Sequence, residues 1–176
     1  MQHVNNYASF SKITDLKNIY NSTDLKDIGT FDKYLNYLNN YFIKSDILYH
    51  GDFSKLETPY ISTGKNKFGD GFYLTNDIKY AYNFGNIIHH CLVDTSKVKF
   101  FKDQIDFFKI IAAYFNINKL PSKSQINEYT KHLYNEGYII HIIKTNLPQE
   151  FIIGDISKCF ILGSKHDINN FNSSLK

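Results

Sequence analysis

Three separated segments place a titratable or aromatic side chain beside a glycine or at the start of an apolar run. His50 precedes a glycine in "LYHG", Tyr73 follows two glycines in "GDGFYLT", and Glu150 opens "EFIIG". A carboxylate, an imidazole and an aromatic ring can together stabilise positive charge, move a proton and hold a flat ligand. Taken singly, each is more commonly structural: a turn histidine, a core tyrosine and a solvated glutamate at a strand edge.

Short strands are expected to carry these three side chains, with helices between them. Strands are predicted at 46–51, 71–75, 138–144, 150–155 and 158–163, with one or two more within 86–101. Helices are predicted across 1–45 (including 30–45, with Thr30 as N-cap), and at 76–84, 103–116 and 122–137. Asn-rich patches near Asn5, Asn39 and Asn169 indicate turns or frayed ends. Because helices and strands do not alternate regularly, the fold class is α+β.

The domain organisation follows from length and composition. A chain of 176 residues with 43% hydrophobic residues can bury one core. We expect residues 1–45 to form an N-terminal helical element packed on the same domain as residues 46–176. No repeat or low-complexity linker divides the chain. A monomer is the default expectation.

The basic residues limit the ways in which the protein can hold a phosphate. All 20 are lysines, and the chain contains no arginine. Any phosphate must therefore be held by lysine, backbone N–H groups or hydroxyls, without a bidentate guanidinium. A net charge of +3 over the whole chain gives no basic footprint for a nucleic-acid-binding module that lacks catalysis.

The cellular location is expected to be cytoplasmic. The N-terminus lacks the apolar core of a signal peptide, and the apolar runs 137–143 and 151–153 are too short to span a bilayer. We therefore expect no membrane partner. Cys91 and Cys159 make no disulfide framework and fit a reducing compartment.

Two other kinds of site are disfavoured. "HHC" at 89–91 contains metal-ligating types, but adjacent residues of a strand point to opposite faces, and no second cluster accompanies it. We therefore expect no metal. A cysteine nucleophile is also disfavoured, because neither cysteine is at a turn or helix start.

Together and in this order, the three segments resemble the ADP-ribosyltransferase superfamily of the His–Tyr–Glu type, which includes diphtheria toxin and the poly-ADP-ribose polymerases. "LYHG" resembles its first-strand histidine motif, and "FGDGFYLTNDIKYAYNF" its glycine-turn, strand and helix segment. "NEGYIIHII" and "QEFIIGDISKCFIL" resemble its last segments, which contain the catalytic glutamate. The resemblance covers about 46–163. It implies two packed, mostly antiparallel sheets forming an NAD cleft.

The resemblance also implies roles for individual residues. Glu150 would be the catalytic carboxylate beside the ribose, and His50 would bond a ribose hydroxyl. Tyr73 and Phe84 would stack on the nicotinamide, and the Gly51 backbone would meet its amide. A flexible turn between two glycines, Gly69 and Gly71, would let the chain swing around NAD. Further cofactor-binding candidates are Ser54, Lys67 and Thr75, with Lys65 as an alternative to Lys67 at the diphosphate.

The chain departs from the family pattern at several positions. Ala81 stands where the helix often has serine, so Thr75 or Tyr80 would have to contact the amide. Asp52 stands where serine or threonine commonly follows the His–Gly pair. The Arg–Ser–Glu branch is excluded because the chain has no arginine. Pro148 replaces the Glu or Gln that arginine-modifying members carry two positions before the glutamate, so arginine is disfavoured as acceptor.

The expected activity is NAD-dependent mono-ADP-ribosyl transfer to an unknown protein or nucleic-acid acceptor. A small chain without a chain-elongation apparatus favours mono- over poly-ADP-ribosylation. The loops 52–68 and 144–149 are candidates for choosing the acceptor. Alternatives are an inactive module that binds NAD, ADP-ribose or a partner, and an NAD glycohydrolase. By analogy, a bacterial or phage toxin or effector is expected, including one delivered to a host without a signal.

Overall fold

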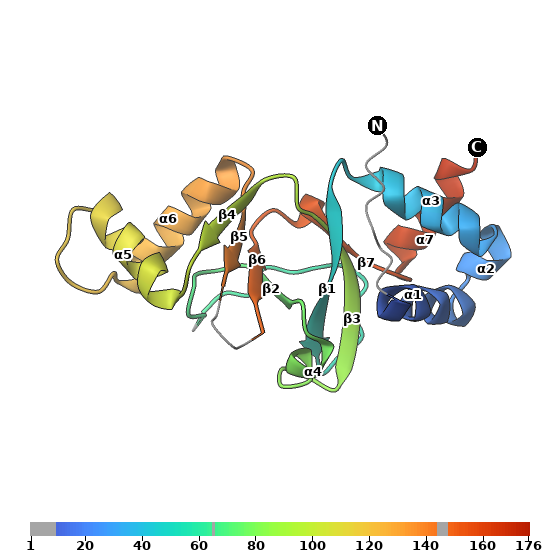
Figure 1. The fold of residues 1–176 in the computed structure, drawn as a ribbon, viewed down its shortest axis with the longest axis horizontal. Helices are drawn as coiled ribbons and strands as arrows, with labels where there is room; N and C mark the ends of the chain where they lie inside the picture. Colours follow the sequence, from blue (N-terminus) through green and yellow to red (C-terminus); the bar gives the residue numbers. More distant parts are fainter. Residues whose placement is uncertain (1–9, 65, 144–147) are drawn as a thin grey trace.

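The computed structural model describes residues 10–64, 66–143 and 148–176. A sheet occupies the middle of an elongated molecule, with helices at both ends (Figure 1). The helices are α1 (Phe10–Ser22), α2 (Leu25–Ile28), α3 (Phe31–Tyr41), α4 (Ile78–Ala81), α5 (Gln104–Tyr114), α6 (Lys123–Asn135) and α7 (Lys165–Ser174), with one 3-10 turn, η1 (Ile156–Lys158). The strands are β1 (Ser45–Asp52), β2 (Phe72–Thr75), β3 (Ile87–Asp94), β4 (Val98–Phe101), β5 (Ile139–Ile142), β6 (Glu150–Ile153) and β7 (Cys159–Ile161).

All seven strands belong to one sheet, in the order β4-β5-β6-β2-β1-β3-β7. Only β4 and β5 pair in parallel. The α+β class is confirmed, but the strands form one sheet instead of the two that were predicted. β1 pairs with β3 along its whole length, whereas β1 and β2 share the single register pair Tyr49↔Thr75. We call this narrow junction the seam. It joins two half-sheets, β4-β5-β6-β2 and β1-β3-β7.

Local sequence signals account for most of the helix starts. Thr30 caps α3, as predicted, and accepts a hydrogen bond from the Lys33 backbone N–H. Ser122 and Gln125 form a capping box at the start of α6. The helix predicted at 76–84 is a single turn, α4, which Asp77 caps through the N–H groups of Lys79 and Tyr80.

The C-terminal helix α7 was not predicted, because the Asn-rich segment around Asn169 was interpreted as a turn. That interpretation is wrong, as is the one of Asn39, which lies inside α3; Asn5 is outside the described residues. Ser164 caps α7 by accepting from the Asp167 N–H. The helix buries Phe171 completely, so tertiary packing outweighs the low helix propensity of asparagine.

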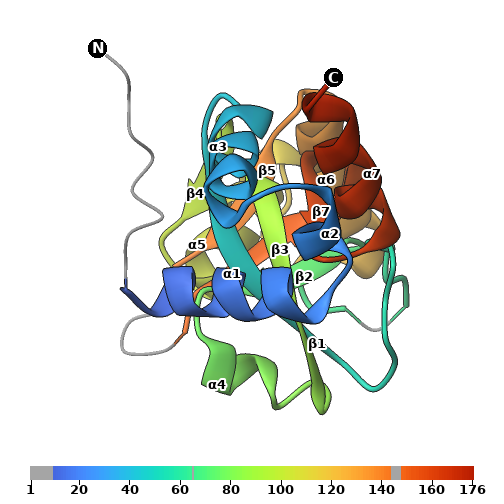
Figure 2. The same cartoon turned by 90° about the vertical axis from the view of Figure 1, so that its right-hand side faces the viewer.

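The helices α1, α2, α3 and α7 pack together beside β1, β3 and β7 (Figure 2). Their common core contains side chains from both ends of the chain: Leu16, Leu25, Tyr34, Tyr37, Leu38, Ile47, Leu92, Phe160, Leu162 and Phe171. Because Ile47 and Leu92 belong to strands, the N-terminal helices share their core with the sheet. Within it, the Tyr34 hydroxyl donates to Asp167 Oδ2 at 2.6 Å.

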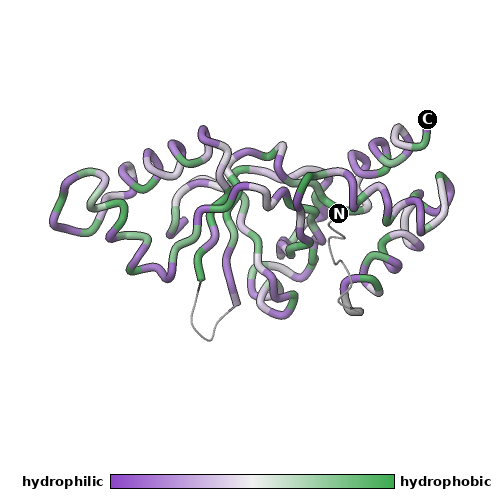
Figure 3. The backbone as a smooth tube through the Cα atoms, turned by 45° about the horizontal axis from the view of Figure 1, so that its top comes forward, coloured by the Kyte–Doolittle hydropathy of each residue, from purple (hydrophilic) through white to green (hydrophobic). Residues whose placement is uncertain are grey.

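The helices α5 and α6 cover the other half-sheet. Their core contains Phe68, Phe101, Phe107, Ile111, Ile126, Tyr129, Leu133, Ile140, Ile142 and Ile152. Hydrophilic and hydrophobic residues alternate along these helices, while the strands between the two helical ends contain more continuous hydrophobic stretches (Figure 3). Each half-sheet therefore has its own helical cover, and the seam lies between them.

Candidate active site at the seam

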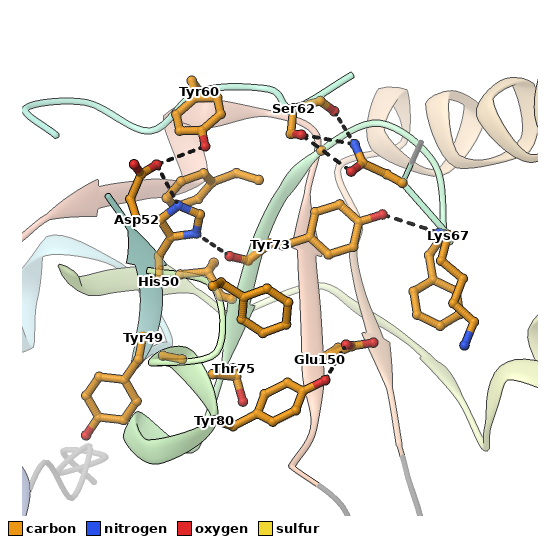
Figure 4. A pocket seen from close by; sticks show the side chains of 18 of the residues that line it. Tyr49, His50, Asp52, Tyr60, Ser62, Lys67, Tyr73, Thr75, Tyr80 and Glu150 are labelled. Carbon is orange, nitrogen blue, oxygen red and sulfur yellow. Dashed lines mark hydrogen bonds and ion pairs between the residues drawn. The ribbon is translucent and has the colours of Figure 1, made fainter. Parts of the chain in front are cut away.

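A cavity of about 500 Å³ lies beside the seam, within the range typical of small-molecule sites. Its lining residues are Tyr49, His50, Gly51, Asp52, Phe53, Tyr60, Ser62, Asn66, Lys67, Phe68, Gly71, Phe72, Tyr73, Leu74, Thr75, Tyr80, Ala81, Phe84 and Glu150. The strand order places β1, β2 and β6 side by side, which brings His50, Tyr73 and Glu150 to this cavity (Figure 4). Among the sequence-predicted site residues, Ser54 is not part of the lining.

His50 lies where β1 and β2 separate. Its Nδ1 lies 2.6 Å from the Tyr73 carbonyl oxygen, and since a carbonyl only accepts, Nδ1 carries the proton. Burial lowers the pKa of His50, although the Tyr73 carbonyl and the Asp52 carboxylate oppose this shift. The neutral ring therefore keeps a lone pair on Nε2, which is buried and has no hydrogen-bond partner among the described residues.

Asp52 is held as an anion at the same end of the cavity. Its Oδ1 accepts from the backbone N–H and the hydroxyl of Ser54, at 2.9 and 3.0 Å. Its Oδ2 accepts from the Tyr60 hydroxyl at 3.0 Å. These hydrogen bonds, with the Ser54 N–H first, lower the pKa of Asp52 to about 2. Ser54, a predicted cofactor ligand, is thus engaged in fixing Asp52.

Tyr73 is fixed through its hydroxyl. This group donates to the Gly69 carbonyl at 2.6 Å and accepts from the Phe68 N–H at 3.3 Å. Burial raises the pKa of Tyr73, so the ring stays a neutral phenol. With its hydroxyl occupied by its own turn, the side chain can offer a cavity ligand its ring face.

The turn between Gly69 and Gly71 is attached to α6. Gly69 has φ of +93°, which favours glycine. The Asp70 N–H donates to Asn127 Oδ1, Asn127 donates back to Asp70 Oδ2, and the Tyr134 hydroxyl donates to the Asp70 carbonyl. In this structure the turn is hydrogen-bonded to α6 and supports Tyr73; its movement around a ligand stays a prediction.

Glu150 opens β6 opposite Thr75 of β2. Paired residues of neighbouring strands project to one face, and Tyr73 is two positions from Thr75, so all three share that face. The Tyr80 hydroxyl donates to Glu150 Oε1 at 3.3 Å. Helix α4 thus reaches the carboxylate from a segment 70 residues away in the chain. Thr75 is buried, and its hydroxyl accepts from the Asp77 N–H.

Gly51 permits close contact between β1 and α4. A Cβ at this position would lie 2.0 Å from the Ala81 carbonyl oxygen. The missing side chain is therefore explained by packing against α4. Phe84 follows α4, is 53% exposed and contacts Tyr80 edge-on, with 5.3 Å between ring centroids. Gly51 thus lets α4 bring Tyr80 and Phe84 to the cavity.

The described lining contains more negatively than positively charged side chains. Within the described lining, the carboxylates are Asp52 and Glu150, and Lys67 supplies the one ammonium. Lys67 is exposed, with its Nζ 5.4 Å from the Phe68 ring centroid. Lys65 is outside the described residues. Near Lys67, the Asn66 amide donates to the Ser62 carbonyl and hydroxyl.

The metal-ligating and thiol side chains that the sequence singled out can also be located in the part of the chain that the structure describes. No group of three or more His, Cys, Asp or Glu side chains gathers there as metal ligands. His89 Nε2 lies 3.1 Å from the Ser54 carbonyl oxygen, while His90 Nε2 lies 3.5 Å from Asp15. Both cysteines are free and buried. Within the same residues, no helix has the length and apolarity needed to cross a bilayer.

Comparison with known proteins assigns no family to this chain. No family model matches the chain, and no curated protein matches it. A crystal structure of an anti-CRISPR protein is similar, with a TM-score of 0.42 and 10% sequence identity, over 67% of this chain and 94% of that chain. A TM-score this low carries no argument about fold family or function.

Sequence reasoning missed several residues of the cavity. Tyr80 was considered only as a contact for an amide, and Tyr60 was not singled out. The signal for Tyr80 was available, because Asp77 as N-cap places it in the first turn of α4. Tyr60 reaches Asp52 across an irregular loop, whose path the sequence pattern does not predict.

Proposed function

We propose that the protein is an NAD-dependent mono-ADP-ribosyltransferase, with Glu150, His50 and Tyr73 as its central residues. The observation that carries the proposal is their convergence. A histidine, a tyrosine and a glutamate from three distant segments, in the order of the His–Tyr–Glu motif, line one cavity. Their chemistry suits the cleavage of the bond between nicotinamide and ribose.

Glu150 would act on the reacting ribose. Loss of nicotinamide leaves positive charge on the ribose, as in glycoside cleavage. A carboxylate held beside that ribose stabilises the charge, and it can accept the proton that an attacking hydroxyl or amine loses. The hydrogen bond from Tyr80 to Glu150 supports this role because it fixes one carboxylate oxygen.

The aromatic side chains would hold the leaving group. Nicotinamide is flat, and rings such as Tyr73 and Phe84 can stack on it. The tether of the Tyr73 hydroxyl to Gly69 supports this role because it fixes the ring before a ligand binds. Lys67, on the cavity rim, would meet the diphosphate.

The acceptor would approach over the loops around the cavity. The loop 52–68 contributes Phe53, Tyr60 and Lys67 to the lining, and Phe53 is 79% exposed. Of the second candidate loop, 144–149, residues 144–147 are outside the described residues. We propose a macromolecular acceptor, because exposed aromatic and basic side chains beside a cavity suit contact with a larger surface.

The test is nicotinamide release from NAD by purified protein, alone and with a cell lysate. Glu150→Gln should lower release by about 100-fold or more. Glu128→Gln is the matched control, since Glu128 is exposed on α6. ADP-ribose labelled in the lysate fraction, and lost with Glu150→Gln, would identify the acceptor.

The other outcomes separate the alternatives. Release without lysate that depends on Glu150 would favour an NAD glycohydrolase. NAD binding without release under either condition would favour an inactive binding module. Absence of NAD binding would overturn the proposal.

A further inference from the structure

A second cavity, of about 800 Å³, lies at the end of the molecule that contains the N-terminal helices (Figure 1). Its walls are α3 and α7, which contact each other (Figure 2). We call it the helical groove; its lining residues fall within 33–41 and 170–175. It shares no described lining residue with the cavity at the seam, so it is a separate candidate site.

The lining of the helical groove is rich in groups that both donate and accept hydrogen bonds. Helix α3 contributes the side-chain amides of Asn36 and Asn40, and α7 contributes Asn170 and two serine hydroxyls. Within the described lining there is no carboxylate, Lys33 supplies the one ammonium, and Leu175 is the one aliphatic side chain. Most small-molecule sites have the opposite composition, with an apolar lining and few polar groups. The helical groove therefore suits a ligand with many polar groups.

Two tyrosines of α3 supply aromatic surface in the same lining. The rings of Tyr37 and Tyr41 meet edge-on, with 5.5 Å between centroids and 79° between planes. Tyr37 is buried, whereas Tyr41 is 36% exposed. A cyclic ligand can pack against a ring here while its substituents reach the amides of both helices.

Hydrogen bonds hold these side chains in place without a ligand. Asn170 Nδ2 donates to the Tyr41 hydroxyl at 3.0 Å, and it lies 2.9 Å from His166 Nε2, which accepts. With both N–H groups engaged, Asn170 keeps Oδ1 as an acceptor, and the Tyr41 hydroxyl keeps its own hydrogen to donate. Asn40 Nδ2 donates to the Asn36 carbonyl at 2.7 Å, which uses one of its two N–H groups. The groove thus presents donors and acceptors side by side.

We propose that the helical groove binds a neutral saccharide. Sugar hydroxyls donate and accept hydrogen bonds, as side-chain amides do, and the C–H face of a sugar ring packs on an aromatic ring. A nucleic acid needs more cations than Lys33, and a cationic ligand finds no carboxylate in the described lining. An apolar ligand would leave the amides without partners. The inference does not depend on the proposed function.

The experiment is an NMR titration of the isotope-labelled full chain with neutral oligosaccharides of glucose, galactose, mannose and N-acetylglucosamine. At least one should bind with a Kd of about 1 mM or tighter, and the shifted amides should belong to α3 and α7. Tyr41→Ala should weaken this binding at least about tenfold, because it removes both the ring and the hydroxyl. Asn36→Ala, at an exposed position, should weaken it about threefold.

Asn172→Ala is the matched control for Asn36→Ala. Asn172 is also exposed, on α7, but it is not part of the lining, so its variant should keep the wild-type affinity. Lys33→Gln should keep it too, because a neutral ligand does not need the ammonium. If thermal melting shows that Tyr41→Ala does not fold, the exposed Asn36→Ala still tests the groove.

Several outcomes would overturn this inference. One is that none of the four kinds of oligosaccharide binds, and another is that folded groove variants keep the wild-type affinity. Shifts confined to the seam cavity would place the sugar elsewhere, and a loss in Lys33→Gln as large as that in Tyr41→Ala would show a ligand held by charge. Nicotinamide release by Asn36→Ala should equal that of the wild type, so the two sites are tested separately.

Discussion

The hydroxyl of Tyr80 donates a hydrogen bond to Oε1 of Glu150, with 3.3 Å between the two oxygens. Tyr80 is therefore expected to position the carboxylate. Tyr80→Phe should lower kcat by about tenfold while KM for NAD changes by less than about twofold, because the lost contact acts on Glu150. Steady-state nicotinamide release measures both constants.

A nearby residue provides the control for that variant. Tyr82 is 58% exposed directly after α4 and is not part of the cavity lining. Tyr82→Phe should retain wild-type kcat. Equal losses in the two variants would indicate that α4 is sensitive to any change, and that Tyr80 has no particular role.

NAD affinity should depend on the protonation of His50. Burial lowers the pKa of His50 from 6.5, so the ring is neutral above that pH and Nε2 can accept a ribose hydroxyl. Affinity should be constant above about pH 6.5 and fall at lower pH, where Nε2 gains a proton. Calorimetry between about pH 5 and 8 measures this. His50→Ala should bind more weakly at every pH and lose the dependence.

The exposed His132 serves as the control for this profile. It pairs with Glu136 on α6, and His132→Ala should keep the wild-type pH dependence. An affinity that rises on acidification would contradict the assignment, since Nε2 would then act as a donor.

Stability should decrease as the pH rises through the titration of Asp167. Burial raises its pKa to about 6, against the hydrogen bonds from Tyr34 and Gly163. The folded-state pKa lies above the unfolded one, so the stabilisation is complete below about pH 4 and is lost as the pH passes 6. By the size of this shift, the loss is about 3 kcal/mol of unfolding free energy.

Asp167→Asn should remove this pH dependence and make the protein more stable than wild type at pH 8. An amide does not ionise, and its oxygen can still accept from Tyr34 and Gly163. Its NH₂ group can donate to the Tyr37 hydroxyl, which lies beside the Asp167 side chain. Urea unfolding at about pH 4.5 and 8 measures the difference. If the free energy of unfolding changed equally between the two pH values in variant and wild type, Asp167 would not titrate in this range.

Gly51→Ala should damage both stability and activity. The new Cβ would meet the Ala81 carbonyl at 2.0 Å, so α4 must shift, taking Tyr80 away from Glu150. We expect a loss of about 1–3 kcal/mol in unfolding free energy and slower nicotinamide release. Thermal melts and the release assay report the two effects separately.

Gly64→Ala is the contrasting variant. Gly64 has φ of +109°, but a Cβ there would meet nothing within 4 Å. The substitution should lower the free energy of unfolding by about 1 kcal/mol through backbone strain. Nicotinamide release should be unchanged. If Gly51→Ala also left release unchanged, the close contact of β1 with α4 would not matter for the site.

The sequence predicted most elements of the sheet because short apolar runs bounded by glycine, proline and polar residues are typical of strands. It also singled out His50, Tyr73 and Glu150, which the structure brings to one cavity. This was possible because each stands at a change of local pattern: before a glycine, after a glycine turn, and at the first position of an apolar run.

What could not be predicted depends on contacts between distant segments. Tyr80 and Glu150 are joined only because β2 pairs with β6 and α4 follows β2. The single sheet arises from one residue pair, Tyr49 with Thr75, and no local pattern encodes such a pair. Helix α7 is stabilised by burial of Phe171 among helices from the other end of the chain.

The seam should also influence how the molecule exchanges its amide hydrogens. β1 pairs with β3 along its whole length, whereas a single register pair joins β1 to β2. Opening at this junction breaks few backbone hydrogen bonds, but it also exposes a buried cluster that both half-sheets share, with Leu48 and Cys91 on one side and Phe72 on the other. A ligand that bridges β1 and β6 would add a further connection between the half-sheets. We therefore expect its binding to slow exchange also on strands that it does not touch.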